Sequence, residues 1–293
     1  MERLNILKTY KLYIGGAFPR TESGRYYELK NKKGENIGNI CLASRKDLRN
    51  AVVAARKVSG AWSERTHLNR SQILYRIAEM LEARKQQFVQ ELVSMGYTEK
   101  NAAAEVDLSV DRLVYYAGWC DKYTQVLSSV NPVASSHFNF STVEPVGVVG
   151  VIADDKTGLL DIISVVAPII SGGNTVVILA AENYPLAAIS FAEVLNSSDV
   201  PGGVVNILTG KREELLKHMA SHMDINAIAY PSMTTEINKM IELEAVENLK
   251  RTRKLKEDWS KVDAQSLKLI EAFQEVKTTW HPIENIGGAT STY

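Results

Sequence analysis

Residues 144–186 read EPVGVVGVIADDKTGLLDIISVVAPIISGGNTVVILAAENYPL, and this stretch decides the fold. Two short runs, at 147–153 and 175–180, are apolar on successive positions, which is typical of strands covered on both faces in a parallel sheet. The apolar segment 159–171 between them predicts a helix. A further helix at 185–197 and a further strand at 204–208 repeat the unit. This alternation predicts an α/β fold built on a doubly wound parallel sheet with right-handed crossovers.

The N-terminal third predicts short strands followed by helices. Residues 11–42 hold apolar runs separated by turns that contain Gly, as strands and their connections do. Ser44, followed three residues later by Asp47, has the spacing of a helix N-cap. Apolar residues at helical spacing then predict helices from Ser44, over Asn69–Met95 and over Lys100–Val126. All three helices are amphipathic, so each needs a surface to pack against.

The remaining segments predict a strand, a connector and a tail. His137–Val143 alternates apolar and polar residues, as a strand with one buried face does. Residues 236–273 are rich in Lys, Glu, Arg and Leu, and we expect a solvated helical connector there rather than a binding patch. Residues 274–282 are strand-like, and we expect the end of the chain to be a flexible tail.

The composition argues against several classes of function. The 34 basic and 34 acidic side chains give a net charge of zero, so we expect no nucleic-acid or membrane partner. The longest apolar run, 159–170, is interrupted by Asp161 and is too short to span a bilayer. Two cysteines without metal-ligand spacing, and a start unlike a signal peptide, lead us to expect a cytoplasmic protein. His218 and His222 are four residues apart, but no further ligand accompanies them, so we expect a surface pair and no metal site.

Several motifs stand in the order and spacing of one enzyme family. The sequence resembles the aldehyde dehydrogenase superfamily over about residues 8–235 and again near 274–282. The resemblance implies the family's Rossmann-like cofactor-binding domain over residues 1–235, an association hairpin at about 130–146, and an association strand within 274–293. It also implies a homo- or hetero-oligomer with members of that family. The motifs that carry it are Tyr13-Ile-Gly-Gly16, Tyr115-Tyr-Ala-Gly-Trp119, Glu144-Pro-Val-Gly-Val-Val-Gly150, Gly173-Asn-Thr-Val-Val177 and Pro201-Gly-Gly-Val-Val-Asn-Ile-Leu-Thr-Gly210.

The first strand-to-helix turn departs from the family's pattern. The family has Pro-Trp-Asn after this strand, and the Asn amide stabilises the oxyanion that forms when a thiolate attacks an aldehyde. This chain has Asp154-Asp155-Lys156 instead. A pair of carboxylates would repel developing negative charge, and we expect Lys156 to be a surface residue of the loop rather than an oxyanion donor.

The positions that hold the cofactor's adenosine also differ. The family's Lys-Pro-x-Glu binds the ribose hydroxyls; here the Lys is lost and the Glu is kept as Glu182. Gly210 is retained, whereas two later glycines, where the backbone lies close to the cofactor, are replaced by Arg212 and Leu216. Both replacements remove the close approach that glycine permits. A later Gly-Ser pair corresponds to Ser232-Met233, where capture of a phosphate by a helix N-terminus is only weakly indicated.

In the family, the general base and the cysteine nucleophile lie in a second domain that follows this part of the sequence. This sequence has no cysteine after Cys120. A thiolate is needed for the covalent step, and both Cys41 and Cys120 are expected to be structural. We therefore predict no catalytic residue, and no cofactor with certainty. NAD or NADP would bind only at a weakened site. The residual cofactor-binding positions are Ile152, Lys156, Glu182 and Gly210.

Three hypotheses about function follow. The first is a non-catalytic companion, a pseudoenzyme subunit that assembles with itself or with an active aldehyde dehydrogenase through the strands at 138–143 and 275–281. The second is an NAD(P)-dependent aldehyde oxidoreductase that is active only when a partner supplies the nucleophile. The third is a nucleotide-binding module that uses Glu182 and the first strand-to-helix turn.

Overall fold

A parallel sheet of five strands forms the centre of the computed structural model, which describes residues 7–283. The strand order is β10-β9-β6-β7-β8, so the chain starts in the middle, builds outward on one side and then returns to build the other. Every residue of the four strands β6 to β9 is buried. The predicted doubly wound α/β fold is confirmed. The strands are β6 Val148–Ile152, β7 Thr175–Leu179, β8 Val205–Leu208, β9 Ala227–Pro231 and β10 Arg251–Leu255.

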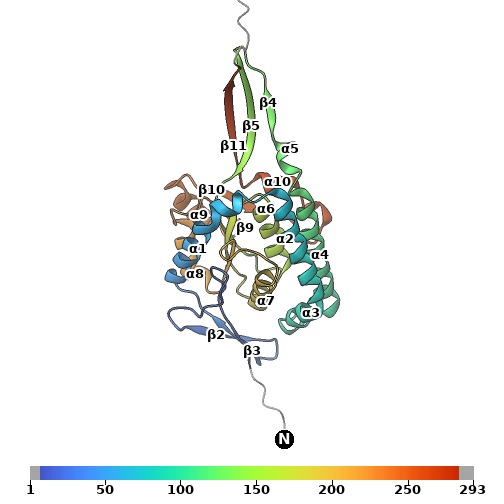
Figure 1. The fold of residues 1–293 in the computed structure, drawn as a ribbon. Helices are drawn as coiled ribbons and strands as arrows, with labels where there is room; N and C mark the ends of the chain where they lie inside the picture. The colour runs from blue at the N-terminus through green and yellow to red at the C-terminus, as the bar shows by residue number, and fades with distance from the viewer. Residues whose placement is uncertain (1–6, 284–293) are drawn as a thin grey trace, which may run out of the picture.

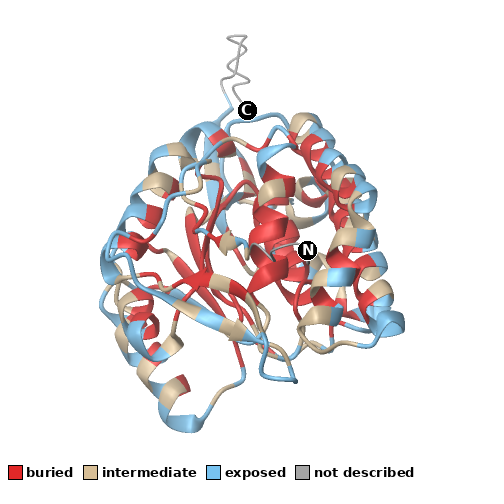
Figure 2. Ribbon diagram, turned by 90° about the horizontal axis from the view of Figure 1, so that it is seen from below, coloured by how far each residue is buried: buried red, intermediate tan, exposed pale blue. Residues whose placement is uncertain are grey.

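Helices cover both faces of this sheet (Figure 1). On one face α1 packs against β6, β7 and β8, and α8 packs against β6, while α9 lies against β10. On the other face α6 and α7 pack against β7 and β8, and α2 and α4 cover α6 in turn. Buried residues gather at the centre of the molecule and exposed ones on the outer sides of the surrounding helices (Figure 2). These helices are α1 Arg45–Ser63, α2 His67–Ala83, α4 Glu99–Trp119, α6 Leu160–Ser171, α7 Pro185–Asn196, α8 Arg212–Ala220 and α9 Thr235–Val246.

Side chains of each central strand alternate between two separate apolar cores, as the pleat requires. Val149 and Val151 of β6 belong to the core shared with α2, α4, α6 and α7. Val148 and Ile152 belong to the core shared with α1 and α8. Because both faces are apolar, β6 and β7 are continuous apolar runs, which is why the sequence identified them clearly.

The N-terminal segment forms a small sheet and then enters the helices as expected. Its strand order is β1-β3-β2. The predicted N-cap is confirmed, because the Ser44 hydroxyl accepts from the Asp47 amide and the Asp47 carboxylate accepts from the Ser44 amide at 2.8 Å. Two long predicted helices are each divided into two, at Arg84 and at residues 120–122. The elements not yet given are β1 Thr9–Tyr10, β2 Tyr26–Lys30, β3 Asn36–Cys41, α3 Lys85–Ser94 and α5 Tyr123–Leu127.

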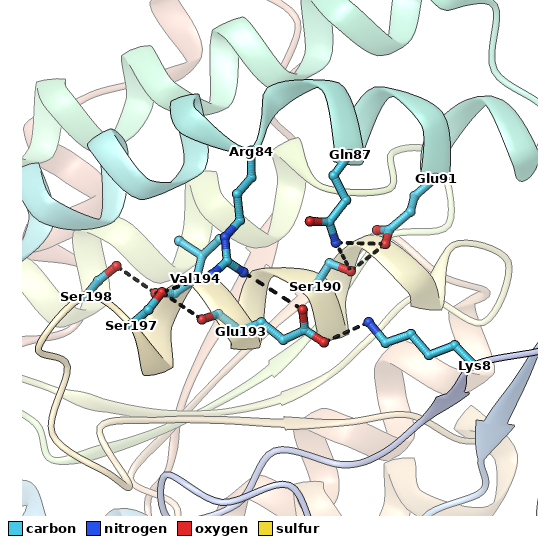
Figure 3. A network of polar contacts seen from close by, with 9 residues as sticks. All are labelled: Lys8, Arg84, Gln87, Glu91, Ser190, Glu193, Val194, Ser197 and Ser198. Atoms are coloured by element: carbon cyan, nitrogen blue, oxygen red, sulfur yellow. Dashed lines mark hydrogen bonds and ion pairs between the residues drawn. The ribbon is translucent and has the colours of Figure 1, made fainter.

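A network of polar side chains joins α3 to α7 (Figure 3). The Ser190 hydroxyl donates to Glu91 at 2.7 Å, and burial raises the pKa of the Glu91 carboxyl. Glu193 on α7 pairs with Lys8 at 2.7 Å and lies 3.9 Å from the Arg84 guanidinium. The network holds the start of the described chain and the α2–α3 junction against one helix.

A three-stranded antiparallel arm projects from the body of the molecule (Figure 1). It consists of β4 Ser129–Asn131, β5 His137–Pro145 and β11 Gln274–Pro282, in the order β11-β5-β4. β11 pairs with β5 along its whole length, from Gln274 opposite Pro145 to Pro282 opposite His137. The hairpin expected at about 130–146 and the strand expected from 274 are therefore neighbours in one sheet. The expected tail, residues 284–293, lies outside the described residues.

The expectation of a helical connector over 236–273 is partly wrong. α9 occupies its start, but β10 follows and joins the central sheet parallel to β9. β10 is an edge strand whose charged residues are exposed (Arg251) or half-buried (Arg253 and Lys254), and such a strand lacks the apolar alternation by which strands are recognised. Lys250 fixes its beginning by donating to the carbonyls of His222 at 2.8 Å and Ile225 at 2.7 Å. The connection ends with a 3-10 helix, Val262–Ala264, and α10, Leu267–Glu271.

Candidate functional site at the carboxyl edge of the sheet

The candidate site lies where the direction of chain winding reverses. β6 has β7 on one side and β9 on the other, so the connections after β6 and β9 run to opposite faces of the sheet. Ligands of doubly wound proteins bind in the crevice at the carboxyl ends of strands at this point. A cavity of about 190 Å³ is found here, lined by the ends of β6, β9 and β10 and by the start of α6.

The turn after β6 carries two of the predicted positions. Ile152, the last residue of β6, is fully buried and lines the cavity. Lys156 stands at the mouth of the cavity with its side chain 81% exposed and pairs with Asp154 at 3.3 Å. Lys156 therefore points mainly to solvent, as expected of a loop residue. Its part in binding a cofactor stays a prediction.

A carboxylate from another helix occupies the N-terminus of α6. One oxygen of Glu105, on α4, accepts from the amides of Gly158 at 2.9 Å, Leu159 at 2.7 Å and Leu160 at 3.3 Å. The first amides of a helix attract anions because they lack partners within the helix and carry its positive dipole end. In this protein an internal carboxylate meets that need. Sequence reasoning missed Glu105, because an acidic residue on an amphipathic helix gives no indication of such a partner.

Asp161, in the first turn of α6, is a buried acid beside the cavity. It is 3% exposed, and one of its oxygens accepts from the Asp154 amide at 2.6 Å. The other oxygen has no hydrogen-bond partner among residues 7–283. Burial is the main cause that raises the pKa of this carboxyl to about 7. The sequence showed Asp161 only as an interruption of an apolar run.

Glu182, the retained acid of the ribose-binding pair, is engaged within the protein. One oxygen pairs with Lys211 at 2.9 Å, and the other accepts from the Arg212 amide at 2.7 Å. The Glu182 amide donates to Asp155 at 2.9 Å. Its side chain is 24% exposed, and both of its carboxylate oxygens have partners within the protein. Its part in binding a cofactor stays a prediction.

Arg212 completes this arrangement, which we call the carboxyl-edge cluster: Asp155, Glu182, Lys211 and Arg212. Its guanidinium pairs with Asp155 at 2.6 Å and donates to the carbonyl of Ala153. Leu216, one turn further along α8, is buried in the core shared with α1. The two positions that the resemblance assigns to bare glycine are thus filled by an ion-pairing side chain and a core side chain.

Gly210 packs against the N-terminal segment. A Cβ at this position would lie 3.2 Å from the backbone nitrogen of Ala43, which is tighter than most contacts allow. The neighbouring Thr209 hydroxyl donates to the Cys41 carbonyl at 2.7 Å. The close approach that Gly210 permits is therefore used inside the protein, and its role toward a cofactor stays a prediction.

The other candidate residues give little chemistry. Ser232 lines the cavity, but the N-terminus of α9 is capped by the hydroxyl of Thr234, which accepts from the Ile237 amide at 3.4 Å. Cys41 and Cys120 are buried, and burial raises the pKa of the Cys120 thiol to about 11, so it holds its proton.

His218 lies on α8, while His222 lies beyond the end of that helix and accepts from the Asp224 amide at 3.2 Å. Between residues 7 and 283, no three His, Cys, Asp or Glu side chains are grouped in a way that could hold a metal ion. Within the same range, no helix has the length and apolar character needed to cross a membrane.

Comparison with known proteins gives a consistent result. Residues 19–253 match the model of the aldehyde dehydrogenase family. Cytosolic 10-formyltetrahydrofolate dehydrogenase of Mus musculus is 31% identical over 251 residues, 82% of this chain and 27% of that protein. Aldehyde dehydrogenase, cytosolic 1, of Elephantulus edwardii is 31% identical over 249 residues, 82% of this chain and 49% of that protein.

Solved structures agree with the sequence matches. The NAD+ complex of an aldehyde dehydrogenase from Bacillus cereus superposes with a TM-score of 0.79 at 27% identity, covering 84% of this chain and 50% of that one. An aldehyde dehydrogenase from Burkholderia cenocepacia superposes with a TM-score of 0.80 at 28% identity, covering 83% and 50%. The chain spans about half the length of these relatives, or less.

Proposed function

The chain belongs to the aldehyde dehydrogenase family, and from this premise we propose that it acts as a non-catalytic subunit that associates, through its arm, with a second copy or with an active family member. The observation that carries the proposal is the carboxyl-edge cluster, because Lys211 and the Arg212 amide already bind Glu182, the acid that would bind a cofactor.

The cluster supports a weakened cofactor site. A ribose hydroxyl that approaches Glu182 must displace Lys211 or the Arg212 amide, and both contacts involve charge. Hydrogen bonds to charged groups contribute about 1.5–3 kcal/mol each, so the competition removes much of what one ribose contact could supply. Arg212 also occupies volume where the family has glycine, and Asp155 holds it there.

The connection between β10 and β11 supports a non-catalytic role for this chain. The resemblance places the general base and the cysteine in a second domain after the cofactor domain. Here residues 256–273 lead from β10 directly to β11 of the arm through two short helices. Both cysteines of the sequence precede this connection and are buried. A thiol enclosed in the core cannot reach an aldehyde to form the covalent intermediate that aldehyde oxidation needs.

The arm supports association. It carries apolar side chains in solvent, among them Val130, Phe138, Val276 and Trp280, which are 68%, 47%, 67% and 56% exposed. Among residues 7–283, β11 pairs on one side only, with β5, and β4 covers only residues 139–141 of β5. Exposed apolar patches and unpaired strand edges mark surfaces that bind another chain.

Light scattering after size-exclusion chromatography tests association. We expect the chain to form an oligomer alone or with the Bacillus cereus aldehyde dehydrogenase, and Trp280→Ser or Phe138→Ser to shift it toward the monomer. Val262→Ser is the matched control, because Val262 is 72% exposed but lies outside the arm. A chain that remains monomeric both alone and in the mixture would refute association. Aldehyde-dependent reduction of NAD or NADP by the chain alone would refute the non-catalytic role.

One observation favours a nucleotide-binding function as the second candidate. The cavity at the carboxyl ends of β6 and β9 is lined in part by Ser232, which precedes α9. Calorimetric titration with NAD and with NADP separates the candidates. Micromolar affinity without turnover would favour nucleotide binding, whereas affinity weaker than about 1 mM would favour the companion.

A further inference from the structure

A groove of about 700 Å³ collects basic side chains far from the carboxyl-edge cluster. The groove is lined by the start of α1, the end of α8 and the turn after α8, whereas the cluster lies at the start of α8. Its volume falls within the range of about 300–1,000 Å³ that is typical of sites for small molecules. The titratable side chains that line it are Arg45, Lys46, Arg49, His218, His222 and Glu22. The groove is therefore basic, although the whole chain has a net charge of zero.

Two arginines of this groove have no acid to pair with. Among the described residues Glu22 is the one acid that lines the groove, and it is already engaged. Its carboxylate pairs with Lys46 at 3.2 Å and accepts from the Ser44 hydroxyl at 3.2 Å. Arg45 and Arg49 are exposed and form no ion pair with any residue from 7 to 283. They stand four residues apart on α1, so their side chains are neighbours on one face of the helix.

The helix itself disfavours cations at this place. Arg45 and Lys46 begin the first turn of α1, where the positive end of the helix dipole repels cations. Asp47, the acid of that turn, is used inside the protein, because its carboxylate accepts from the Ser44 amide at 2.8 Å and from the Thr21 hydroxyl at 2.6 Å. The two basic residues therefore add to a positive potential that a bound anion would offset.

The other wall of the groove adds a neutral donor and an apolar side chain. The Nδ1 atom of His222 accepts from the Asp224 amide at 3.2 Å, so Nε2 carries the proton and can donate. Burial is the main cause that lowers the pKa of His222, and this favours the neutral ring that the hydrogen bond requires. Met223, the next residue, is 62% exposed and also lines the groove.

We propose that this groove binds the di- or triphosphate group of a small molecule, with phosphates held by Arg45 and Arg49. A guanidinium presents parallel N–H donors that match a phosphate, and each arginine can hold a separate phosphate group. A chain of phosphates carries enough negative charge to match both arginines, which one carboxylate does not. The proposal is independent of the association proposed above, since no residue of the arm lines the groove.

Calorimetric titration of the full chain with inorganic tripolyphosphate and with inorganic phosphate tests the groove. We expect a dissociation constant below about 1 mM for tripolyphosphate, and binding about tenfold tighter than that of phosphate. Adenosine triphosphate distinguishes two sources of the group. Tighter binding than tripolyphosphate, lost in Met223→Ser, would assign the groove to a nucleotide, and equal binding would assign it to free polyphosphate.

Two variants locate the site. Arg45→Gln and Arg49→Gln should each weaken tripolyphosphate binding about fivefold or more. Lys57→Gln is the matched control, because Lys57 is exposed on the same helix and does not line the groove; its effect should stay below about twofold. Arg45→Gln should keep or raise the melting temperature, since it removes a cation from the first turn of α1.

Three results would overturn the proposal. The first is the absence of saturable tripolyphosphate binding at concentrations up to about 5 mM. The second is unchanged binding in both Arg45→Gln and Arg49→Gln. The third is a loss in Lys57→Gln as large as theirs, because the anion would then respond to the overall charge of the chain rather than to the groove.

Discussion

Removing Glu105 tests whether this one carboxylate organises the candidate site. The acid is buried on α4, and a single oxygen accepts from three successive amides at the start of α6, at 2.7 to 3.3 Å. Glu105→Ala leaves those amides without a partner in a buried region and opens a small cavity. Glu105→Gln keeps a carbonyl oxygen in place and removes only the negative charge.

The structure gives the size of each effect. Breaking a buried charged contact costs about 3–5 kcal/mol, and an unsatisfied buried amide alone costs about 1–3 kcal/mol. We therefore expect Glu105→Ala to lower the free energy of unfolding by about 3–5 kcal/mol. For Glu105→Gln we expect about 1–2 kcal/mol, because the loss is confined to charge assistance and to the interaction with the helix dipole.

Urea unfolding followed by far-ultraviolet circular dichroism measures both variants. Asp111→Ala is the control, since Asp111 is exposed on the same helix and its removal should change stability by less than about 0.5 kcal/mol. A loss below about 1 kcal/mol for Glu105→Ala would refute the reasoning, because the amides would then have found other partners. Equal losses for Ala and Gln would refute the part assigned to hydrogen bonding.

Three further predictions concern other charged residues. The pKa of Asp161 is higher in the folded chain, about 7, than its ordinary value of 3.8, so its stabilising contribution is present at low pH and is lost as pH rises through 7. The unfolding free energy of Asp161→Asn, relative to the unaltered chain, should therefore increase by about 2–3 kcal/mol from pH 5 to pH 8 in urea titrations. Arg212→Gly removes the guanidinium that pairs with Asp155 and fills the position where the family has glycine, and should strengthen NAD binding about tenfold by calorimetry, whereas unchanged binding would show that Arg212 does not obstruct the site. Glu193→Gln breaks half-exposed ion pairs with Lys8 and Arg84 and should cost under about 1 kcal/mol in thermal unfolding; a larger loss would mean that the network in Figure 3 is cooperative.

Elements whose character is set by nearby residues could be predicted from the sequence. β6 and β7 are continuous apolar runs because both faces of each strand are buried, and this is visible within five residues. The capping box of Ser44 and Asp47 depends on two residues three apart. The sequence predicts a helical connector where β10 lies, because β10 carries mostly polar and charged residues and its place at the sheet edge depends on pairing with β9.

The sequence by itself determined the doubly wound sheet and the loss of the family's residues at 154–156 and 212. The resemblance implied the hairpin and the C-terminal strand, and the tertiary structure shows that they pair with each other. Only the tertiary structure decided what replaces that chemistry. Glu105 reaches α6 from a distant helix, Arg212 pairs with Asp155, and Asp161 is buried with one oxygen that has no partner among residues 7–283. The physical reason is the range of the interactions. Strand and helix patterns arise from neighbours two to four residues apart, whereas a charge finds its partner, or lacks one, only when segments far apart in sequence are packed together.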